Sequence, residues 1–141
     1  MTTSKVIQFA AGLEREGKPR GIRVGCWPHA TRGTQNVVVM EAGPASRLVY
    51  ITNKSDDPGF WSLNENQLNG LRSSGKEWFA VLLVGRLETG YVLTSLQVEK
   101  GTHSWSQNRS DFKVHEGQEI SGSFTFDRFS DAFAHLMAGL G

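Results

Sequence analysis

The chain has 141 residues and a mass of 15.6 kDa, close to the roughly 150 residues typical of one domain, so we expect a single domain over 1–141. Hydrophobic residues make up 38% of the sequence and charged residues 21%, which excludes a disordered acidic tail and a fibrous repeat. The net charge of +1 argues against the strong nonspecific nucleic-acid binding of highly basic proteins.

No segment of the sequence resembles a membrane span or a signal peptide. The longest apolar run, 78–84, is far shorter than the roughly 20 residues that a membrane-spanning helix needs. A single cysteine, Cys26, is typical of a reducing compartment. The sequence therefore predicts a cytoplasmic protein with no membrane partner.

Charge is distributed unevenly along the chain. Residues 1–47 carry seven basic and three acidic side chains, a net charge of +4, whereas residues 56–141 carry seven basic and eleven acidic ones, a net charge of −4. A basic half can attract phosphate groups at short range. The alternative is that these charges form an ordinary solvated surface.

The first part of the chain predicts a helix followed by a strand. Apolar residues recur at helical spacing over 5–16, and the glycines and proline of 17–21 end that helix. Apolar and polar residues then alternate over 22–26, which predicts a strand. Cys26 falls on the inward face of this strand, where we expect it to be a small core residue.

The next two apolar segments predict a hairpin. Residues 37–40 and 48–52 are rich in β-branched and aromatic side chains, and the turn sequence 43–46 separates them. We therefore expect antiparallel strands over 35–53.

A second helix and a buried strand are predicted further along the chain. Ser62 and Glu65 have the spacing of a capping box, which predicts a helix over 63–72 with Leu68 and Leu71 facing inward. The run 78–84 is apolar on both faces, as in a central strand covered on both sides.

The rest of the chain adds peripheral elements. Residues 91–98 predict a strand beside the central one, and 102–111 predict a mobile polar loop. Residues 120–126 indicate a short edge strand, and 129–140 have helical spacing. The fold class is therefore α/β (α+β), with a mixed central sheet in α-β-β-β-α-β-β order and a C-terminal β-α extension.

Segments 48–54 and 60–68, taken with this order of elements, resemble the core of the PD-(D/E)XK, or restriction-endonuclease-like, nuclease superfamily. The resemblance covers about residues 5–98 and leaves 99–141 as an extension. In that family a strand-2 aspartate and a strand-3 Glu-x-Lys hold one or two Mg²⁺ ions beside the scissile phosphate, and the lysine orients or activates the attacking water. The resemblance implies a phosphodiesterase fold with nucleic acid, DNA in particular, as its partner.

Hairpin geometry indicates which residues occupy the positions of the family motif. If Glu41 and Arg47 flank the turn, Asn36 falls opposite Thr52, and Lys54 shares the face of Thr52. The family has Asp, Glu and Lys at these positions, so only Lys54 matches in type. An amide and a hydroxyl provide no charge to offset the dehydration of Mg²⁺. We therefore expect a degraded catalytic site at Asn36, Thr52 and Lys54, with no metal ligands and no cofactor.

Three functions remain open at this point. The first is a nucleic-acid-binding domain with a degraded cleavage site. The second is an active Mg²⁺-dependent endonuclease that recruits carboxylates from elsewhere, the candidates being Glu14, Glu16, Asp56 and Glu65. The third is a non-catalytic subunit that binds a protein partner and keeps only the scaffold.

A nucleic-acid face is predicted from basic and aromatic side chains. Arg20, Arg23 and Arg32 flank the first strand and its loop, and we expect them on the same side as Lys54, where they can contact phosphates. Trp105 lies in a polar loop and is the best candidate for stacking on a base.

Overall fold

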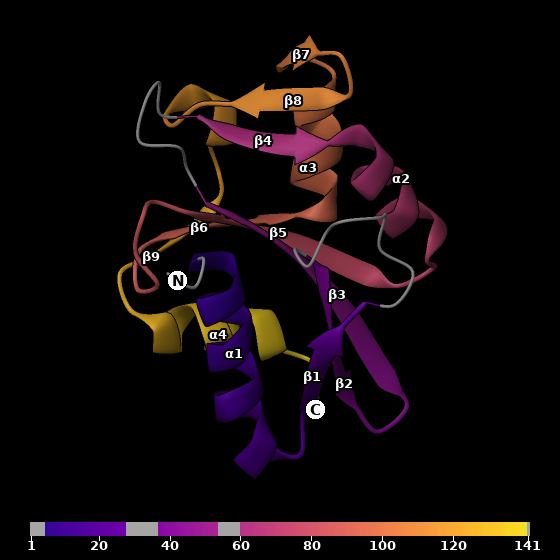
Figure 1. Ribbon diagram of the computed structural model, residues 1–141, viewed down its shortest axis with the longest axis vertical. Helices are drawn as coiled ribbons and strands as arrows, with labels where there is room; N and C mark the ends of the chain where they lie inside the picture. The colour runs from indigo at the N-terminus through magenta and orange to yellow at the C-terminus, as the bar shows by residue number, and fades with distance from the viewer. Residues whose placement is uncertain (1–4, 28–36, 54–59, 141) are drawn as a thin grey trace.

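The computed structural model describes residues 5–27, 37–53 and 60–140. Within these ranges the chain forms a six-stranded sheet in the order β1-β2-β3-β5-β6-β9 and a three-stranded sheet in the order β4-β8-β7 (Figure 1). The strands are β1 (Arg23–Cys26), β2 (Val37–Ala42), β3 (Ala45–Asn53), β4 (Trp61–Asn64), β5 (Glu77–Leu83), β6 (Gly90–Thr94), β7 (Ser106–Asn108), β8 (Asp111–Val114) and β9 (Phe124–Phe126). The helices are α1 (Lys5–Gly17), α2 (Glu65–Ser73), α3 (Ser95–Thr102) and α4 (Phe129–Met137), with 3₁₀ turns η1 (Lys18–Arg20) and η2 (Gln118–Ile120).

The predicted hairpin is confirmed, with its register shifted by one residue. Ala42 pairs with Ala45 across a two-residue turn, so Glu41 lies opposite Ser46 rather than Arg47. The turn is this short because Gly43 adopts a φ of +60°, a conformation that glycine reaches at little cost. The expected pairing of Asn36 with Thr52 falls on a residue outside the described part of the chain.

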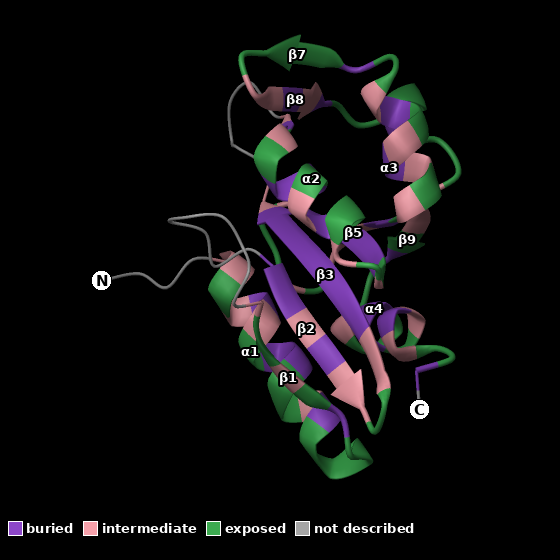
Figure 2. Cartoon of the chain, turned by 90° about the vertical axis from the view of Figure 1, so that its right-hand side faces the viewer, coloured by how far each residue is buried: buried purple, intermediate pink, exposed green. Residues whose placement is uncertain are grey.

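The central strand is also confirmed. β5 pairs in parallel with β3, and the chain between them passes through β4 and α2. Both strands are buried along nearly their whole length (Figure 2). A parallel strand covered on both sides is typically apolar throughout, which is the pattern that predicted β5.

Two hydrophobic clusters lie on the two faces of the large sheet. On the first face α1 and α4 contribute Phe9, Leu13, Phe133 and Leu136, which pack on alternate residues of β3 such as Val49. On the second face α2, α3 and the small sheet cover the other alternate residues, including Leu48 and Tyr50. The direction in which a β3 side chain points therefore decides which of two separate environments it meets.

The segment after β3 differs from the prediction. Ser62 lies exposed in β4 instead of capping a helix, and the helix begins at Glu65. Asn64 caps it, because its Oδ1 accepts hydrogen bonds from the backbone N–H groups of Asn66 at 2.9 Å and Gln67 at 3.2 Å. Leu68 and Leu71 face inward as expected.

Residues 91–114 also differ from the prediction. The strand expected over 91–98 ends at Thr94, where a capping box between Thr94 and Gln97 starts α3. The expected loop over 102–111 contains β7 and the start of β8. The edge strand and the C-terminal helix are confirmed as β9 and α4.

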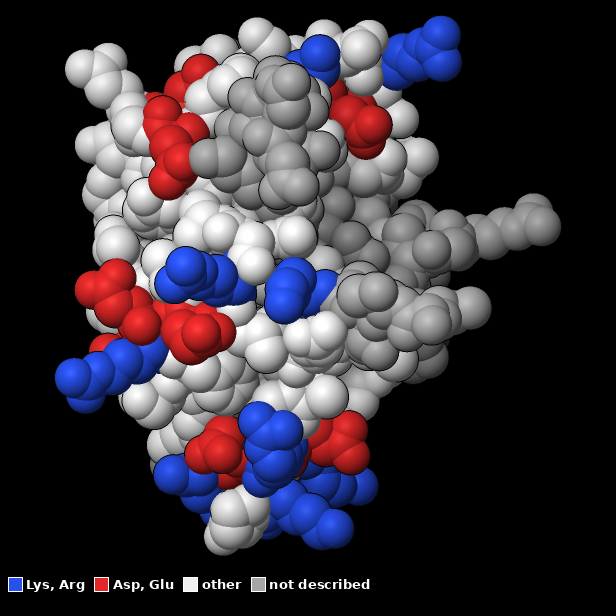
Figure 3. Space-filling view, turned by 60° about the vertical axis from the view of Figure 1, so that its left-hand side comes forward, with Lys and Arg blue, Asp and Glu red and all other residues white. Residues whose placement is uncertain are grey.

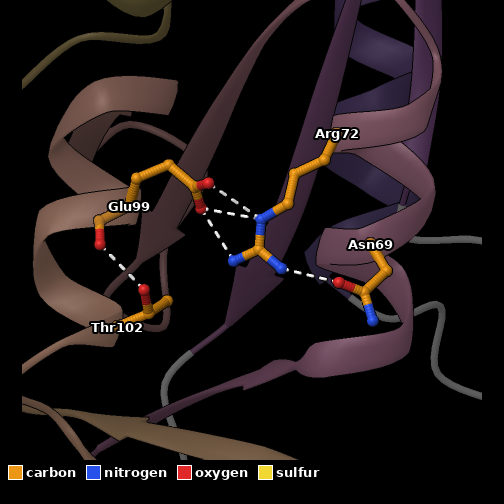
Figure 4. Close-up of polar contacts among 4 residues, drawn as sticks. All are labelled: Asn69, Arg72, Glu99 and Thr102. Carbon is orange, nitrogen blue, oxygen red and sulfur yellow. Dashed lines mark hydrogen bonds and ion pairs between the residues drawn. The ribbon is translucent and has the colours of Figure 1, made fainter.

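A polar bridge joins the two helices of the second face (Figure 4). Arg72 on α2 donates from Nε to both carboxylate oxygens of Glu99 on α3, each at 2.9 Å, and from Nη1 to Oδ1 of Asn69 at 2.7 Å. Thr102 donates its hydroxyl to the Glu99 carbonyl at 2.8 Å. The bridge therefore links α2 to α3 on the second face of the sheet.

Cys26 is exposed, so its assignment to the core is wrong. β1 is a four-residue edge strand in which no side chain is fully buried, and apolar alternation alone did not reveal that this end of the strand lacks a covering layer. Among the described helices, none is long and apolar enough to cross a membrane.

Candidate nucleic-acid interface

Thr52 occupies the C-terminal end of β3 and faces the second hydrophobic cluster. It pairs with Leu82 of β5, which is fully buried there, and it alternates in step with Leu48 and Tyr50. Its residue exposure is 7%. The hydroxyl therefore lies at the edge of an apolar layer, at the end of the sheet where the family resemblance places a carboxylate. Asn36 and Lys54, the other two motif positions, lie outside the described residues.

Asn53, the next residue, points toward the opposite face. Its partner Leu83 belongs to the first cluster, and its Oδ1 accepts a hydrogen bond from the backbone N–H of Gly85 at 2.9 Å. This bond ties the end of β3 to the turn that follows β5. This hydrogen bond therefore restrains the backbone next to Thr52 from the face of the sheet opposite to the Thr52 hydroxyl.

Tyr91, which bonds to the carboxylate of Glu116, belongs to the row of paired residues that contains Thr52. Leu82 pairs with Thr52 on one side and with Tyr91 of β6 on the other. Neighbouring strands lie ~4.8 Å apart, so the Tyr91 backbone is about 10 Å from that of Thr52. Tyr91 donates its hydroxyl to Oε2 of Glu116 at 2.8 Å. This hydrogen bond, more than partial burial, raises the pKa of Tyr91 above its usual value.

Sequence reasoning did not identify Glu116 or Tyr91. Glu116 follows the small-sheet strand β8, of which only the first residue, Asp111, lay within the loop predicted over 102–111, and no spacing in the sequence links it to the hairpin. The connection arises only from the pairing of β6 with β5.

Trp61 joins the small sheet to this end of the large one. Its Nε1 donates to the carbonyl of Leu83 at 2.7 Å, and its ring meets that of Tyr91 edge-on at a centroid distance of 5.8 Å. The side chain is fully buried. Trp61 is therefore a packing residue that positions β4 over the ends of β3 and β5.

Of the carboxylates considered as replacement metal ligands, the structure describes Glu14, Glu16 and Glu65. Glu14 and Glu16 belong to α1, which covers the face opposite to Thr52. Glu65 begins α2 and accepts a hydrogen bond from Gln107 at 2.7 Å. Asp56 lies outside the described residues. Across the ranges that the structure describes, no group of three or more His, Cys, Asp or Glu side chains is arranged to hold a metal ion.

The predicted phosphate contacts Arg20 and Arg23 lie far from Thr52. Arg23 pairs with Glu41 in the sheet, and Glu41 pairs with Ser46 near the start of β3. Thr52 is six positions after Ser46 on β3, so the two residues are about 20 Å apart along the strand. Arg23 and Thr52 therefore lie at opposite ends of the sheet, and Arg32 and Lys54 lie outside the described residues.

Both arginines also have acidic neighbours. Arg20 forms an ion pair with Glu16 at 3.7 Å and lies over the ring of Phe133 at 5.1 Å. Arg23 forms one with Glu41 at 3.7 Å, with 81% of its side chain exposed. Exposed pairs of this kind are weak, so Arg23 stays available to a phosphate, whereas Arg20 also donates from Nη1 to the Glu16 carbonyl.

Trp105 is buried, with 6% exposure, so the prediction that it is exposed is wrong. Its Nε1 donates to the Glu119 carbonyl at 3.0 Å, and its ring fills the space beside Gly101, where an added Cβ would lie 2.1 Å from it. A base cannot stack on the ring in this arrangement. The polar residues around Trp105 in the sequence concealed a core position.

Charges of both signs are interspersed on the molecular surface. In Figure 3 the lysine and arginine side chains of the face shown lie beside aspartate and glutamate side chains. A mixed surface does not favour binding by charge alone. Any nucleic-acid contact must therefore depend on particular side chains.

Comparison with known proteins shows a similar fold without a related sequence. No family model and no curated protein matches the chain. Among solved structures, Hjc from Archaeoglobus fulgidus, a Holliday junction resolvase from an archaeal hyperthermophile, matches with a TM-score of 0.56 and 13% sequence identity. The match covers 93% of this chain and 97% of that chain. The chain therefore has the expected α/β fold with a mixed central sheet and a restriction-endonuclease-like core.

Proposed function

We propose that the chain is a nucleic-acid-binding domain, with DNA as its favoured partner, in which the phosphodiesterase site of a nuclease-like fold is degraded. The observation that carries the proposal is the environment of Thr52. The family resemblance calls for an anionic ligand at this position, and Thr52 offers a neutral hydroxyl on a residue that is 7% exposed. The fold shared with a Holliday junction resolvase supports nucleic acid as the partner.

The donor set at this end of the sheet does not fit Mg²⁺. Mg²⁺ keeps near-octahedral geometry and binds through carboxylates, whereas Thr52 offers one hydroxyl at the edge of an apolar layer. Asn36 would add a neutral amide, and Lys54 would add a positive charge. These residues suit binding of a phosphate group better than binding of a divalent cation.

The proposal includes four basic side chains that bind phosphate, Arg20, Arg23, Arg32 and Lys54. Arg20 and Arg23 lie toward one end of the large sheet and Thr52 lies at the other, so one nucleic acid that touches both must run along the molecule. Replacing any one of these side chains with alanine should reduce the slope of log affinity against log salt by about one unit, with sequence preference nearly unchanged.

A titration with a duplex and a single-stranded oligonucleotide at several salt concentrations tests this function. Wild type should bind with a salt-dependent affinity, and the variant with alanine at Arg20, Arg23 and Arg32 should bind more weakly with a shallower slope. Circular dichroism checks that the variant is folded. The same samples, incubated with plasmid in Mg²⁺, Mn²⁺ or EDTA, should show no efficient cleavage. If wild type binds no nucleic acid, the protein-binding scaffold becomes the better interpretation.

One observation favours the active-enzyme alternative. Glu116 provides a carboxylate linked through Tyr91 to the row of Thr52. If this carboxylate is the relocated ligand of a Mg²⁺-dependent endonuclease, purified wild type will cleave DNA in Mg²⁺, and Glu116→Gln will abolish cleavage while Glu88→Gln, in the exposed turn after β5, leaves it unchanged. Cleavage with this pattern would replace the degraded-site proposal.

A further inference from the structure

Among the described residues, the small sheet β4-β8-β7 has one covered face and one uncovered face. Trp61, Leu63, Phe112 and Val114 point into the second hydrophobic cluster, with exposures between 0% and 6%. Side chains alternate along a strand, so the residues between them point away from the core. The outward residues form two rows across the three strands. One row contains Ser62, Lys113 and Ser106, and the other contains Asn64, Asp111 and Asn108.

An aromatic ring lies at one end of this uncovered face. Phe60 precedes Trp61 and His115 follows Val114, and because Trp61 pairs with Val114, Phe60 and His115 lie opposite one another on the outward side. Their rings are 5.8 Å apart and inclined by 51°. The ammonium group of Lys113 lies 5.1 Å from the centre of the Phe60 ring. We call Phe60, Lys113 and His115 the outer-face cluster.

The outer-face cluster adjoins the Thr52 end of the large sheet. Trp61, next to Phe60, donates its indole N–H to the Leu83 carbonyl. Leu83 pairs with Asn53, the residue after Thr52. The hydrogen bond and the pairing therefore connect the end of β4 with the end of β3, while the outer-face cluster lies on the side of the small sheet that faces away from the large sheet.

The described acidic groups near the cluster have partners, among them Glu116, which accepts from Tyr91 at 2.8 Å. Asp111 accepts from Nδ2 of Asn64 at 3.0 Å. Glu119 accepts from the backbone N–H of His115 at 3.1 Å and lies 3.3 Å from its Nδ1. Lys113 supplies positive charge within the cluster, and the exposed Arg109, in the turn between β7 and β8, lies at the opposite end of the small sheet. The face thus combines an aromatic ring, hydroxyls and cations.

We propose that the outer-face cluster stacks an unpaired base of a single-stranded DNA segment, with Lys113 contacting the adjacent phosphate. The inference rests on the proposed function and specifies its substrate class. Every base has a π-face that can stack on an aromatic side chain, and a nearby cation strengthens the contact. In a continuous duplex the bases are stacked on one another and cannot reach Phe60. The cluster therefore selects DNA with an unpaired segment.

The test compares fluorescence anisotropy titrations of a labelled oligothymidylate and a blunt duplex of equal length. Phe60→Ala should weaken binding of the oligothymidylate about tenfold, the loss expected for one stacked base, with less than about a twofold change for the duplex. Phe60→Tyr, which keeps an aromatic ring, should bind like wild type. Leu96→Ala is the matched control, because Leu96 is an apolar side chain 69% exposed on α3 and outside the cluster.

The outcomes separate this inference from the function on which it rests. If wild type binds DNA with the predicted salt dependence but Phe60→Ala and Leu96→Ala behave alike, the stacking site is overturned and the binding function stands. An equal loss on both DNA forms also overturns it. If wild type binds neither form, both proposals fail.

Discussion

Arg47 and Glu77 face each other across the parallel pairing of β3 and β5 and form an ion pair, with Nη2 of Arg47 2.6 Å from Oε1 of Glu77. The arginine side chain is 8% exposed and the glutamate 57%. Arg47 also donates to the carbonyls of Leu136 and Ala138 at the C-terminal end of α4. One buried guanidinium group therefore joins the two central strands to the last helix.

Removing Arg47 should destabilise the protein strongly. Arg47→Met leaves the two α4 carbonyls without their donor, and we expect the free energy of unfolding to fall by about 3 kcal/mol. Chemical denaturation measures this change in the free energy of unfolding. The matched control is Arg23→Met, which breaks an ion pair between exposed side chains and should cost less than about 1 kcal/mol. Equal losses for the two variants would contradict the role given to Arg47.

Stability should decrease in mild acid because of His135. Its ring stacks on Phe124 at 4.1 Å and meets Phe79 edge-on. Burial, and then the charge of Arg47, lower the pKa of His135 below its usual value. The unfolded chain therefore binds a proton more readily, so the free energy of unfolding falls as the pH drops below ~6.5.

Denaturation curves at pH 7.5 and 5.5 measure this dependence. His135→Phe should lose much of the difference between the two conditions, whereas His103→Gln, at an exposed histidine, should retain it. A wild-type curve that does not change between these conditions would refute the prediction.

Replacing Gln67 should stabilise the fold. Its Nε2 is the buried side-chain nitrogen or oxygen atom within the described residues that has no hydrogen-bond partner, and the residue is 3% exposed. An unsatisfied buried amide is costly, so Gln67→Leu should raise the free energy of unfolding by about 1 kcal/mol. Gln118→Leu, at an exposed position, should change it by less than about 0.5 kcal/mol. Destabilisation by Gln67→Leu would show that the amide has a partner in solution.

The Arg72–Glu99 bridge should contribute modestly and depend on salt. Both side chains are partly exposed, 32% and 40%, so a double-mutant cycle with Arg72→Ala and Glu99→Ala should give a coupling energy of about 0.5–1 kcal/mol. The coupling should decrease at high salt. A coupling that salt leaves unchanged would indicate that packing between α2 and α3, and not charge, holds the helices together.

Restoring the acidic residues of the family motif should create a dependence on metal. In Asn36→Asp with Thr52→Glu, a carboxylate replaces the hydroxyl of a residue that is 7% exposed, so the variant should melt at a lower temperature than wild type in EDTA. Mg²⁺ should raise its melting temperature by binding the folded state, and should leave wild type unchanged. A Mg²⁺ effect on wild type of the same size would contradict the degraded-site proposal.

The sequence predicted elements whose signal is local. The apolar run of β5, the helical spacing of α1 and the turn at Gly43 each specify a conformation within a few residues. These elements were predicted correctly, apart from small shifts at their ends and a shift of one residue in the register of the hairpin. The register was wrong because counting outward from the turn depends on how many residues the turn contains.

The small sheet could not be predicted, because its pairing is not local. Ser62 fits a capping box with Glu65, but in the structure it pairs with Lys113, a partner about fifty residues away. Trp105 packs on Gly101 and donates to the Glu119 carbonyl, and Glu116, just after β8, accepts a hydrogen bond from Tyr91 of β6. Thr52 was placed by a local motif, whereas the residues around it come from strands whose order the sequence does not reveal.

The parallel ladder between β3 and β5 also has a consequence for folding order. Its first pair, Arg47 and Glu77, closes a loop of thirty residues, and neither strand is buried until layers assemble on both faces. Such non-local pairing forms slowly. Amide hydrogens of β3 and β5 should therefore exchange with solvent only when the whole molecule opens, so the strand end that carries Thr52 should acquire its shape in the same late step that completes both hydrophobic clusters.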